Sequence, residues 1–338
     1  MTSSPDTRPD ARREARALFL RRAGWDDADL LPLAGDASFR RYFRLTRGEE
    51  RRVLMDAPPP QEDVRPFVRI ARHLLSLSLS APVVHDVDEA AGFLLLEDLG
   101  DDTYARALAN GADETMLYAL ATDVLVRLHG QGERALLPGL ATYAGETLVE
   151  AAMLVPEWYV PAALERAATP EESESWREAW RTVAARLPAA PLTLVLRDFH
   201  QDNLLLLPER PGVRACGLLD FQDATLGHPA YDLVSLVEDA RRDIDPALRA
   251  TMIDRYVAEA GVADRAAFDA AYAILAAQRH ARIIGLFIRL LRRDGKPTYL
   301  PHLPRVWRMF DRAVRHEALE PVRRWTERHL PPDKRLHR

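Results

Sequence analysis

The segment that most constrains this chain runs from residue 192 to residue 220, where short apolar stretches alternate with polar loops. Residues 192–196, 204–207 and 216–219 are apolar and short, which is typical of buried strands. The loop after the first stretch carries Asp198 and Asn203, five positions apart, and the third stretch ends at Asp220. Strands fix the ends of such loops, so we expect these three polar side chains to be presented at defined places.

The first hundred residues also have strand character. Residues 39–45 alternate strictly, with Arg40, Tyr42 and Arg44 on one face and apolar side chains mostly on the other. This period of two indicates a half-buried strand. Residues 53–55, 82–87 and 93–96 predict further strands, and residues 62–77 predict a helix.

After residue 98 the pattern becomes mostly helical. Helices are predicted over 113–129, with Asp113 as cap, over 170–187 and over 264–293. The last is apolar on most faces but is interrupted by Arg279, His280 and Arg282, which favours a buried helix over a membrane span.

We therefore predict an α+β chain that forms one bilobal unit. A small strand-rich lobe comprises residues 1–98, of which 1–12 are a polar tail. A larger helical lobe comprises residues 99–338, and the connector lies near 97–103.

Composition excludes several classes of protein. A net charge of −5 is too small to indicate a nucleic-acid or membrane-surface partner. The single cysteine, Cys216, fits a reducing compartment, and no apolar run reaches membrane-span length. We expect a soluble, cytoplasmic monomer.

The three polar residues of the strand-rich segment suit phosphoryl transfer. This chemistry needs a carboxylate that orients the acceptor hydroxyl and accepts its proton, and oxygen ligands that hold Mg²⁺ against the phosphates. We assign the first role to Asp198 and the second to Asn203 and Asp220. Asp232, twelve residues further on, is expected to cap a helix or to support the loop by hydrogen bonding.

These motifs resemble the aminoglycoside phosphotransferase and choline kinase superfamily. Within it, residues 35–45, 53–59 and 218–240 resemble bacterial anomeric kinases of N-acetylmuramate and N-acetylglucosamine, which serve cell-wall recycling. The resemblance implies a protein-kinase-like fold with a small antiparallel sheet, ATP and Mg²⁺ as cofactors, and transfer of the γ-phosphoryl group to the sugar C1 hydroxyl.

The resemblance also implies a nucleotide site in the first lobe. A loop would cover the phosphates, an aromatic ring would lie over adenine, and main-chain groups of the connector would read its edge. The residues concerned are Gly35, Asp36, Ala37, Ser38, Tyr42, Glu97 and Leu99.

One expected residue of such a site is missing. Kinases carry a lysine on the strand after the phosphate loop, but the matching position is Met55, and the only lysines are Lys296 and Lys334. Arg40 or Arg44 could supply the cation, and we favour Arg40, which is nearer the loop. The alternative is that both are solvated strand arginines. A second departure is Leu196, where relatives often have histidine.

The acceptor is expected close to Asp198. His200, Gln201, Gln222 and Asp223 flank the motifs and can hydrogen-bond to sugar hydroxyls or to an acetamide. An arginine fork suits the lactyl carboxylate of N-acetylmuramate, and Arg279 and Arg282 are candidates, unless they form structural ion pairs.

Two other readings stay open. The first is a kinase of the same fold that acts on an aminoglycoside, choline, homoserine or another small hydroxyl compound. The second is a nucleotide-binding pseudokinase that regulates a partner, which the missing lysine and Leu196 would favour.

Overall fold

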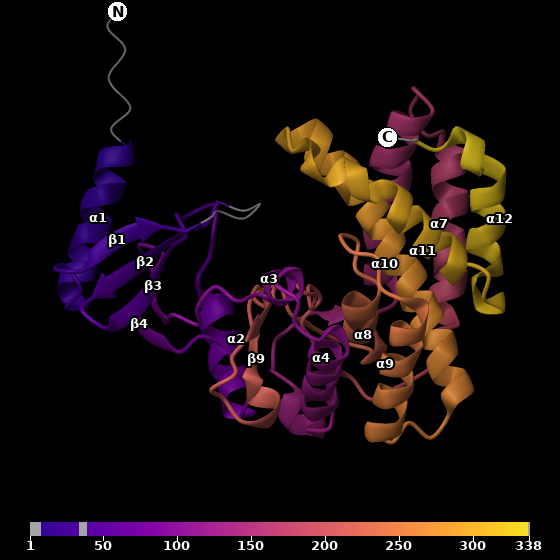
Figure 1. Ribbon diagram of the computed structural model, residues 1–338. Helices are drawn as coiled ribbons and strands as arrows, with labels where there is room; N and C mark the ends of the chain where they lie inside the picture. Colours follow the sequence, from indigo (N-terminus) through magenta and orange to yellow (C-terminus); the bar gives the residue numbers. More distant parts are fainter. Residues whose placement is uncertain (1–7, 34–38, 337–338) are drawn as a thin grey trace, which may run out of the picture. The chain divides into compact units, whose positions relative to one another are not determined.

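The computed structural model describes residues 8–33 and 39–336, and its contacts group the chain into two compact units. We call residues 1–107 with 203–223 the sheet unit, and residues 108–202 with 224–338 the helical unit. Figure 1 shows the strands and helices of each. The sheet unit extends beyond the predicted boundary at residue 98 and takes in a segment that the sequence assigned to the second lobe.

The sheet unit is built on a five-stranded antiparallel sheet of order β1-β2-β3-β5-β4. This agrees with the small antiparallel sheet expected for the first lobe. Its helices and strands are α1 (Arg8–Arg22), β1 (Asp29–Pro32), β2 (Arg41–Arg47), β3 (Glu50–Asp56), α2 (Arg65–Ser76), β4 (Val84–Asp88), β5 (Phe93–Glu97), the start of α3 (Tyr104–Ala109), β8 (Leu204–Leu206), η3 (Gly212–Ala215) and β9 (Cys216–Leu218).

Helix α1 corrects the prediction of a polar tail over residues 1–12, because it begins at Arg8. Residues 1–7 lie outside the described part. Arg12 donates to Asp56 at 2.8 Å, and its guanidinium stacks 3.9 Å from the ring centroid of Phe93. Ion pairing and cation–π contact thus order a segment whose charge suggested a solvated tail.

The apolar face of the sheet packs against α1. Phe19 and Trp25 lie in one buried cluster with Leu45, Leu54 and Phe93. The expected alternation along residues 39–45 therefore holds at its C-terminal end. Phe39, before β2 begins, is 67% exposed.

Residues 203–223 belong to the sheet unit through main-chain pairing. Strands β8 and β9, both predicted as strands, form an antiparallel pair with Leu204 opposite Leu218. The Leu218 N–H donates to the Ser80 carbonyl at 2.7 Å, and Thr103 bridges to Leu205. These long-range bonds explain why a sequence boundary near residue 98 separates segments that fold together.

The helical unit holds most of the helices. Its elements are the end of α3, α4 (Glu114–His129), η1 (Gly132–Ala135), β6 (Thr142–Tyr143), α5 (Glu146–Ala152), the π-helical turn η2 (Val155–Tyr159), α6 (Val160–Ala163), α7 (Pro170–Ala185), β7 (Thr193–Val195), β10 (Thr225–Gly227), α8 (Ala230–Val237), α9 (Pro246–Glu259), α10 (Arg265–Asp294), η4 (Pro297–His302), α11 (Leu303–Ala313), η5 (Glu317–Leu319), α12 (Glu320–His329) and η6 (Pro332–Lys334).

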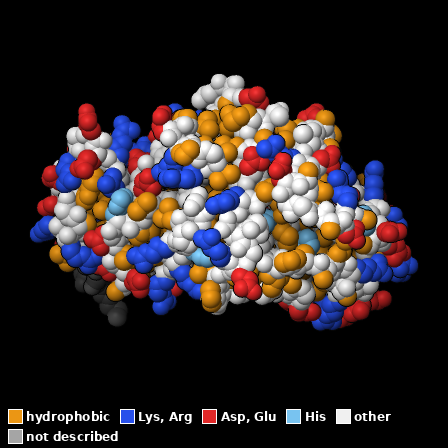
Figure 2. Space-filling model, turned by 90° about the horizontal axis from the view of Figure 1, so that it is seen from below, with side chains coloured by type: hydrophobic (Ala, Val, Ile, Leu, Met, Phe, Trp, Pro, Cys, Tyr) orange, Lys and Arg blue, Asp and Glu red, His pale blue; other side chains and the backbone are white. Residues whose placement is uncertain are grey.

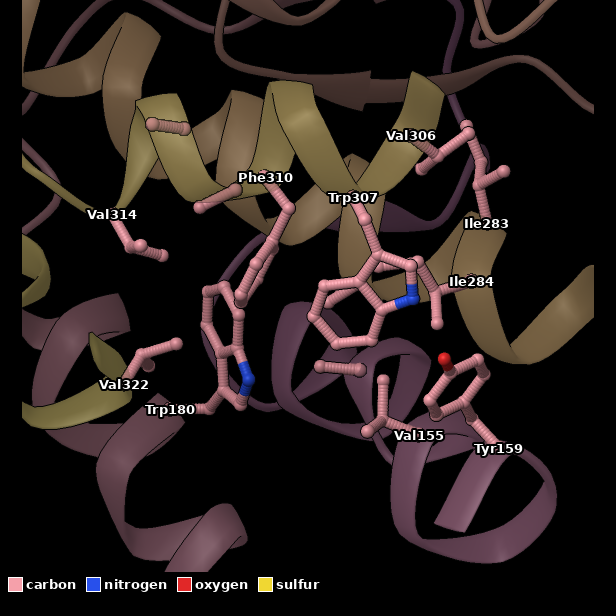
Figure 3. Packing of buried hydrophobic residues seen from close by; sticks show 14 of the residues in the cluster. Val155, Tyr159, Trp180, Ile283, Ile284, Val306, Trp307, Phe310, Val314 and Val322 are labelled. Carbon is pink, nitrogen blue, oxygen red and sulfur yellow. The ribbon is translucent and has the colours of Figure 1, made fainter. Parts of the chain in front are cut away.

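Aromatic side chains fill the core of this unit. Trp307 makes edge-on ring contacts with Tyr159 at 5.1 Å and with Phe310 at 5.4 Å, and Trp180 lies nearby (Figure 3). Tyr159 is fully buried, so it is a core residue. Edge-to-face aromatic pairs add to area burial, and this core anchors α10 against α11.

Helix α10 is the predicted long buried helix and spans Arg265–Asp294. Within residues 8–33 and 39–336, none of the helices combines the length and apolar composition that a membrane span requires. Acidic and basic side chains are interspersed over the face shown in Figure 2.

A small sheet of order β6-β10-β7 leads into the loop that carries Asp198. Strand β7 is the predicted strand at 192–196. It pairs antiparallel with β10, Thr193 opposite Gly227 and Val195 opposite Thr225. Strand β7 therefore ends directly before Leu196, Arg197 and Asp198.

Candidate active site

The loop that carries Asp198 is held by a buried carboxylate on α8. Asp232 is fully buried and accepts the Leu196 N–H at 2.6 Å and the Arg197 N–H at 2.8 Å. Its side chain makes no cap hydrogen bond at the start of α8. Of the two roles expected for Asp232, it therefore has the supporting one.

Arg197 adopts an unusual backbone conformation at the centre of this support. Its φ of +70° lies in the left-handed region, which is costly for a residue with a side chain. Its carbonyl accepts from Ser235 Oγ at 2.9 Å and from Arg279 Nη1 at 3.0 Å. Together with Asp232, these groups bind both main-chain polar atoms of Arg197 and offset the strain.

Asp198 is the carboxylate presented by this loop. Burial acts to raise its pKa, but the charges of Arg279 and Arg282 outweigh it and hold the pKa below its ordinary value. The nearest approach of Arg279 is 3.9 Å, from Nη1 to Oδ1. Asp198 is therefore ionised at neutral pH, as a carboxylate that accepts a proton must be.

Asp232 has the opposite electrostatic character. Burial raises its pKa to about 7, although the two main-chain N–H groups that it accepts favour the ionised form. Two carboxylates in one unit thus have pKa values shifted in opposite directions, a pattern that is common at active sites.

The proposed metal ligands lie together in the sheet unit. Asp220 has φ +54°, and its side chain is 36% exposed. Its Oδ1 accepts from Gln222 at 2.7 Å and from Arg40 at 3.2 Å, and its Oδ2 lies 3.4 Å from the Asn203 amide nitrogen.

This donor set fits magnesium. The ion is held in kinases by one or two protein oxygens together with substrate phosphates. Asp220 supplies a carboxylate and Asn203 an amide, whose oxygen would turn toward an ion. Among the described residues, no three His, Cys, Asp or Glu side chains form a group that could hold a metal ion.

Arg40 is distinguished from Arg44 by its partner. Arg44 donates to Asp98 at 2.6 Å and to Asp101 at 2.7 Å, and these two acidic partners raise its pKa. Arg40 instead lies beside Asp220, with a side chain only 11% exposed. Of the two candidate cations, Arg40 is the one next to a proposed metal ligand.

The other residues expected to bind the nucleotide lie on strands of the five-stranded sheet or directly follow its strand β5. Tyr42 pairs with Met55 across β2 and β3, and Met55 is buried. The Glu97 N–H donates to the Val83 carbonyl at 2.8 Å, so that donor is already used. In the described chain the Leu99 main chain makes no hydrogen bond. Gly35, Asp36, Ala37 and Ser38 lie outside the described residues.

Two of the candidate acceptor-binding residues lie in the loop that carries Asp198. His200 is 4% exposed and its Nε2 lies 3.2 Å from Arg241 Nη1. Burial, together with the charge of Arg241, lowers its pKa to about 3. Gln201 is also buried, and within the described residues its Oε1 has no hydrogen-bond partner. His200 is therefore neutral and engaged by the protein.

The other candidates have different surroundings. Gln222 is bound to Asp220, while Asp223 is exposed. Arg279 is 3% exposed and committed to the loop carbonyl, whereas Arg282, one turn further along α10, is half-buried. Arg282 is thus the more accessible of the two arginines.

Sequence reasoning missed two groups that shape the loop. Ser235 lies one helical turn after Asp232 on α8, within an otherwise apolar run, and that spacing was an available signal. Arg241, which contacts His200 and lies 3.3 Å from Asp202, follows α8 in an irregular segment. No sequence periodicity could have located it.

Known proteins with similar sequences show which family this chain belongs to. A family model described as "Phosphotransferase enzyme family" matches residues 29–271. A Caulobacter vibrioides protein named N-acetylmuramate/N-acetylglucosamine kinase is 38% identical, over 96% of this chain and 98% of its own length. A Pseudomonas aeruginosa protein with the same name is 37% identical, over 86% of each chain.

Solved structures agree on the fold. A choline/ethanolamine kinase family protein from Mesorhizobium loti superposes with a TM-score of 0.62 at 18% identity, covering 94% of this chain and 99% of the other. A microcompartment-associated aminopropanol kinase gives 0.62 at 16% identity, covering 92% and 100%. The predicted kinase-like α+β fold is confirmed, and the chain belongs to the phosphotransferase enzyme family.

Proposed function

We propose that this protein is an ATP- and Mg²⁺-dependent sugar kinase that phosphorylates the C1 hydroxyl of N-acetylmuramate and N-acetylglucosamine in peptidoglycan recycling. The observation that carries the proposal is the 38% identity to a kinase of that name over almost the full length of both chains. The ionised Asp198 supports it, because phosphoryl transfer to an alcohol needs a proton acceptor.

Asp198 has the central role. Its carboxylate accepts a hydrogen bond from the sugar hydroxyl and takes the proton as the hydroxyl oxygen bonds to the γ-phosphorus. The bond from that phosphorus to the bridging oxygen breaks, and ADP leaves with the electron pair. The main-chain bonds from Asp232, Ser235 and Arg279 to Arg197 keep the loop in position for this step.

The sheet unit supplies the groups for ATP. Asn203 and Asp220 hold Mg²⁺, which neutralises phosphate charge when bound. Arg40 takes the place of the missing lysine beside the phosphates. Tyr42 lies over adenine, and the Leu99 main chain reads its edge, with the Glu97 carbonyl as a second candidate.

The acceptor meets groups of the helical unit. Arg282 binds the lactyl carboxylate of N-acetylmuramate, since its charge already acts on Asp198. Arg279 is a positioning residue that acts through the loop. The Gln201 amide oxygen, which has no hydrogen-bond partner among the described residues, is a candidate for a sugar hydroxyl or acetamide N–H. The candidate set also includes His200, which is bound to Arg241, Gln222, which is bound to Asp220, and the exposed Asp223.

A substrate panel tests the proposal. The protein is incubated with Mg-ATP and N-acetylmuramate, N-acetylglucosamine, an aminoglycoside, choline or homoserine, and ADP release is followed with ³¹P NMR of the product. We expect turnover with the two sugars and a 1-phosphate product. A 6-phosphate product would refute the C1 assignment. Turnover only with another acceptor would favour that class, and ATP binding without any turnover would favour a regulatory pseudokinase.

A further inference from the structure

Glu238 is a buried carboxylate at the end of α8 that binds two other helices. It follows Val237 directly, and its exposed fraction is 4%. Its Oε1 accepts from the Tyr272 hydroxyl at 2.8 Å, and its Oε2 accepts from His280 Nε2 at 2.7 Å, both on α10. Arg312 of α11 pairs with the same Oε2 at 2.8 Å. One side chain thus ties the end of α8 to α10 at two points and to α11 at a third.

The charge of Glu238 strengthens these contacts. Burial acts to raise the pKa of Glu238, but the hydrogen bond from His280 and the charge of Arg312 outweigh it and lower the pKa to about 2. Burial lowers the pKa of His280, so the ring is neutral and its single N–H lies on Nε2, which faces the carboxylate. Hydrogen bonds to an ionised acceptor are stronger than those between neutral groups. Glu238 therefore fixes the place of α10 against α8.

The same two helices hold the loop that carries Asp198. From α8, Asp232 accepts the Arg197 N–H, and Ser235 donates to the Arg197 carbonyl. From α10, Arg279 Nη1 donates to that carbonyl at 3.0 Å and lies 3.9 Å from Asp198 Oδ1. A displacement of α10 relative to α8 therefore moves the Arg279 guanidinium with respect to both the loop and Asp198.

His280 is the residue after Arg279, so Glu238 holds α10 next to the group that contacts the loop. Consecutive residues of an α-helix are about 1.5 Å apart along its axis and point in directions about 100° apart. His280 can therefore bind Glu238 while Arg279 binds the loop. The second contact, with Tyr272 two turns earlier, opposes rotation of α10 about its axis.

We propose that Glu238 is a positioning residue for the reaction, which acts through α10 to keep Arg279 beside Asp198. Its effect on the reaction rests on the proposed function, whereas its effect on Asp198 does not. The competing explanation is that Glu238 only stabilises the fold. The two explanations differ in what happens to the Asp198 carboxylate when the contacts of Glu238 are weakened.

Positioning and direct electrostatics have opposite effects on Asp198. Burial acts to raise the pKa of Asp198, and Arg279 supplies the largest of the charges that lower it. A displaced Arg279 therefore raises this pKa. Loss of the negative charge of Glu238 would by itself lower it, since a nearby anion disfavours ionisation. The titratable and charged groups that act on Asp198 are Arg279 and Arg282 of α10, Arg197 and His200 of its own loop, and Asp232 of α8.

Glu238→Gln tests the proposal, because the amide keeps the shape of the side chain, removes its charge and places an N–H₂ group against the donors of α10 and α11. The titration of Asp198 is followed by ¹³C NMR of labelled aspartate, and Asp198→Asn identifies the signal. We expect the midpoint to move upward by about half a pH unit or more. We also expect kcat to fall about 5- to 20-fold with KM for ATP unchanged, and the acidic limb of the kcat–pH profile to move with the titration.

Two tyrosine variants separate positioning from stability. Tyr272→Phe removes one of the three donors to Glu238, so it should cause the same changes at smaller size, and it keeps the test open if Glu238→Gln does not fold. Tyr159→Phe removes another buried hydroxyl of the helical unit, which accepts from the Leu336 N–H at 3.0 Å. It should lower the melting temperature and leave kcat and the titration of Asp198 unchanged.

The titration of Asp198 decides between the explanations. A wild-type midpoint in both Glu238→Gln and Tyr272→Phe would overturn the proposal and leave Glu238 with a structural role alone. A downward move in Glu238→Gln would also overturn it, because it would show a direct effect of charge. If the wild type phosphorylates neither sugar, the proposed function fails, and the NMR titration still decides whether Glu238 positions Arg279 beside Asp198.

Discussion

Asp198 and Asp220 are both carboxylates next to short strands, but the protein holds them in different ways. The loop before Asp198 is bound through its main chain by Asp232, Ser235 and Arg279, two of them fully buried and the third nearly so. The contacts of Asp220 are made by its side chain, with Gln222, Arg40 and, at 3.4 Å, the Asn203 amide.

The difference follows from what each group is proposed to do. A proton acceptor must be in place before the reaction, because a displacement of 1 Å can cost about 100-fold in rate. A magnesium ligand is ordered by the ion and the phosphates that it binds, so it can remain adaptable. Changes around Asp198 should therefore affect kcat, and changes around Asp220 should affect the use of Mg-ATP.

The largest effect is expected for Asp198→Asn. The amide cannot take the hydroxyl proton, so kcat should fall by roughly 10²–10⁴. ATP affinity, measured by titration calorimetry, should stay close to that of the wild type. Near-normal kcat would remove Asp198 as the proton acceptor, and a loss of ATP binding would show that it acts on the nucleotide.

Asp232→Asn tests whether the rigid support matters for the rate. The amide places an N–H₂ group against one of two buried N–H donors, which costs on the order of 1–3 kcal/mol. We expect kcat to fall about 10-fold or more with KM for ATP unchanged. Unchanged kcat would mean that the loop keeps its geometry without this carboxylate.

The same variant has a pH signature. Because the pKa of Asp232 is raised to about 7 in the folded protein, the folded state holds a proton that the unfolded chain releases near pH 4. The free energy of unfolding of the wild type, relative to Asp232→Asn, should therefore fall as pH rises from about 4 to about 7. Urea denaturation between pH 4.5 and 8 measures this difference. A difference that stays constant over this range would show that Asp232 is ionised throughout it.

Arg282→Gln separates the two sugars. N-acetylmuramate carries a carboxylate that N-acetylglucosamine lacks, and a charge-assisted hydrogen bond contributes about 1.5–3 kcal/mol. We expect kcat/KM for N-acetylmuramate to fall about 10- to 100-fold, with a much smaller change for N-acetylglucosamine. Arg292→Gln, on the exposed end of α10, is the matched control. An equal loss with both sugars would show that Arg282 acts only through Asp198.

These contrasts also show what could be predicted from the sequence. The strand–loop–strand pattern around Asp198, Asn203 and Asp220 predicted local structure correctly, because strand periodicity and the spacing of motif residues depend on near neighbours. The membership of residues 203–223 in the sheet unit was not predictable, since it depends on pairing with Ser80 and Thr103, more than a hundred positions earlier.

Arginine roles were the hardest part to predict. The sequence placed Arg279 and Arg282 together as acceptor candidates, yet one turn of α10 separates a buried arginine bound to a loop carbonyl from a half-buried one. Likewise, the sequence predicted Arg12 to be part of a solvated tail, whereas in the structure it contacts Asp56 and Phe93. Side-chain partners of this kind depend on tertiary packing and leave no periodic signal.

The smallest effect is expected for Arg40→Ala. This variant tests the surroundings of Asp220, the proposed magnesium ligand. Arg40 binds the Asp220 carboxylate, and Mg²⁺ is proposed to bind it too, so the two would compete for it as well as share the phosphates. Removing the guanidinium should raise KM for ATP about 3- to 10-fold at saturating magnesium, a modest loss because Asp220 is partly solvated. It should also lower the free Mg²⁺ concentration needed for half-maximal rate.

Matched variants separate the effect of Arg40 on ATP binding from its effect on the magnesium requirement. Arg40→Lys keeps the charge and should restore most of the ATP affinity, while Arg41→Ala, whose side chain is 58% exposed, should change neither constant. If Arg40→Ala alters the magnesium requirement but leaves KM for ATP unchanged, Arg40 only neutralises Asp220. The cation that replaces the missing lysine would then have to come from elsewhere in the chain, and Arg44, bound by Asp98 and Asp101, would have to exchange its partners to supply it.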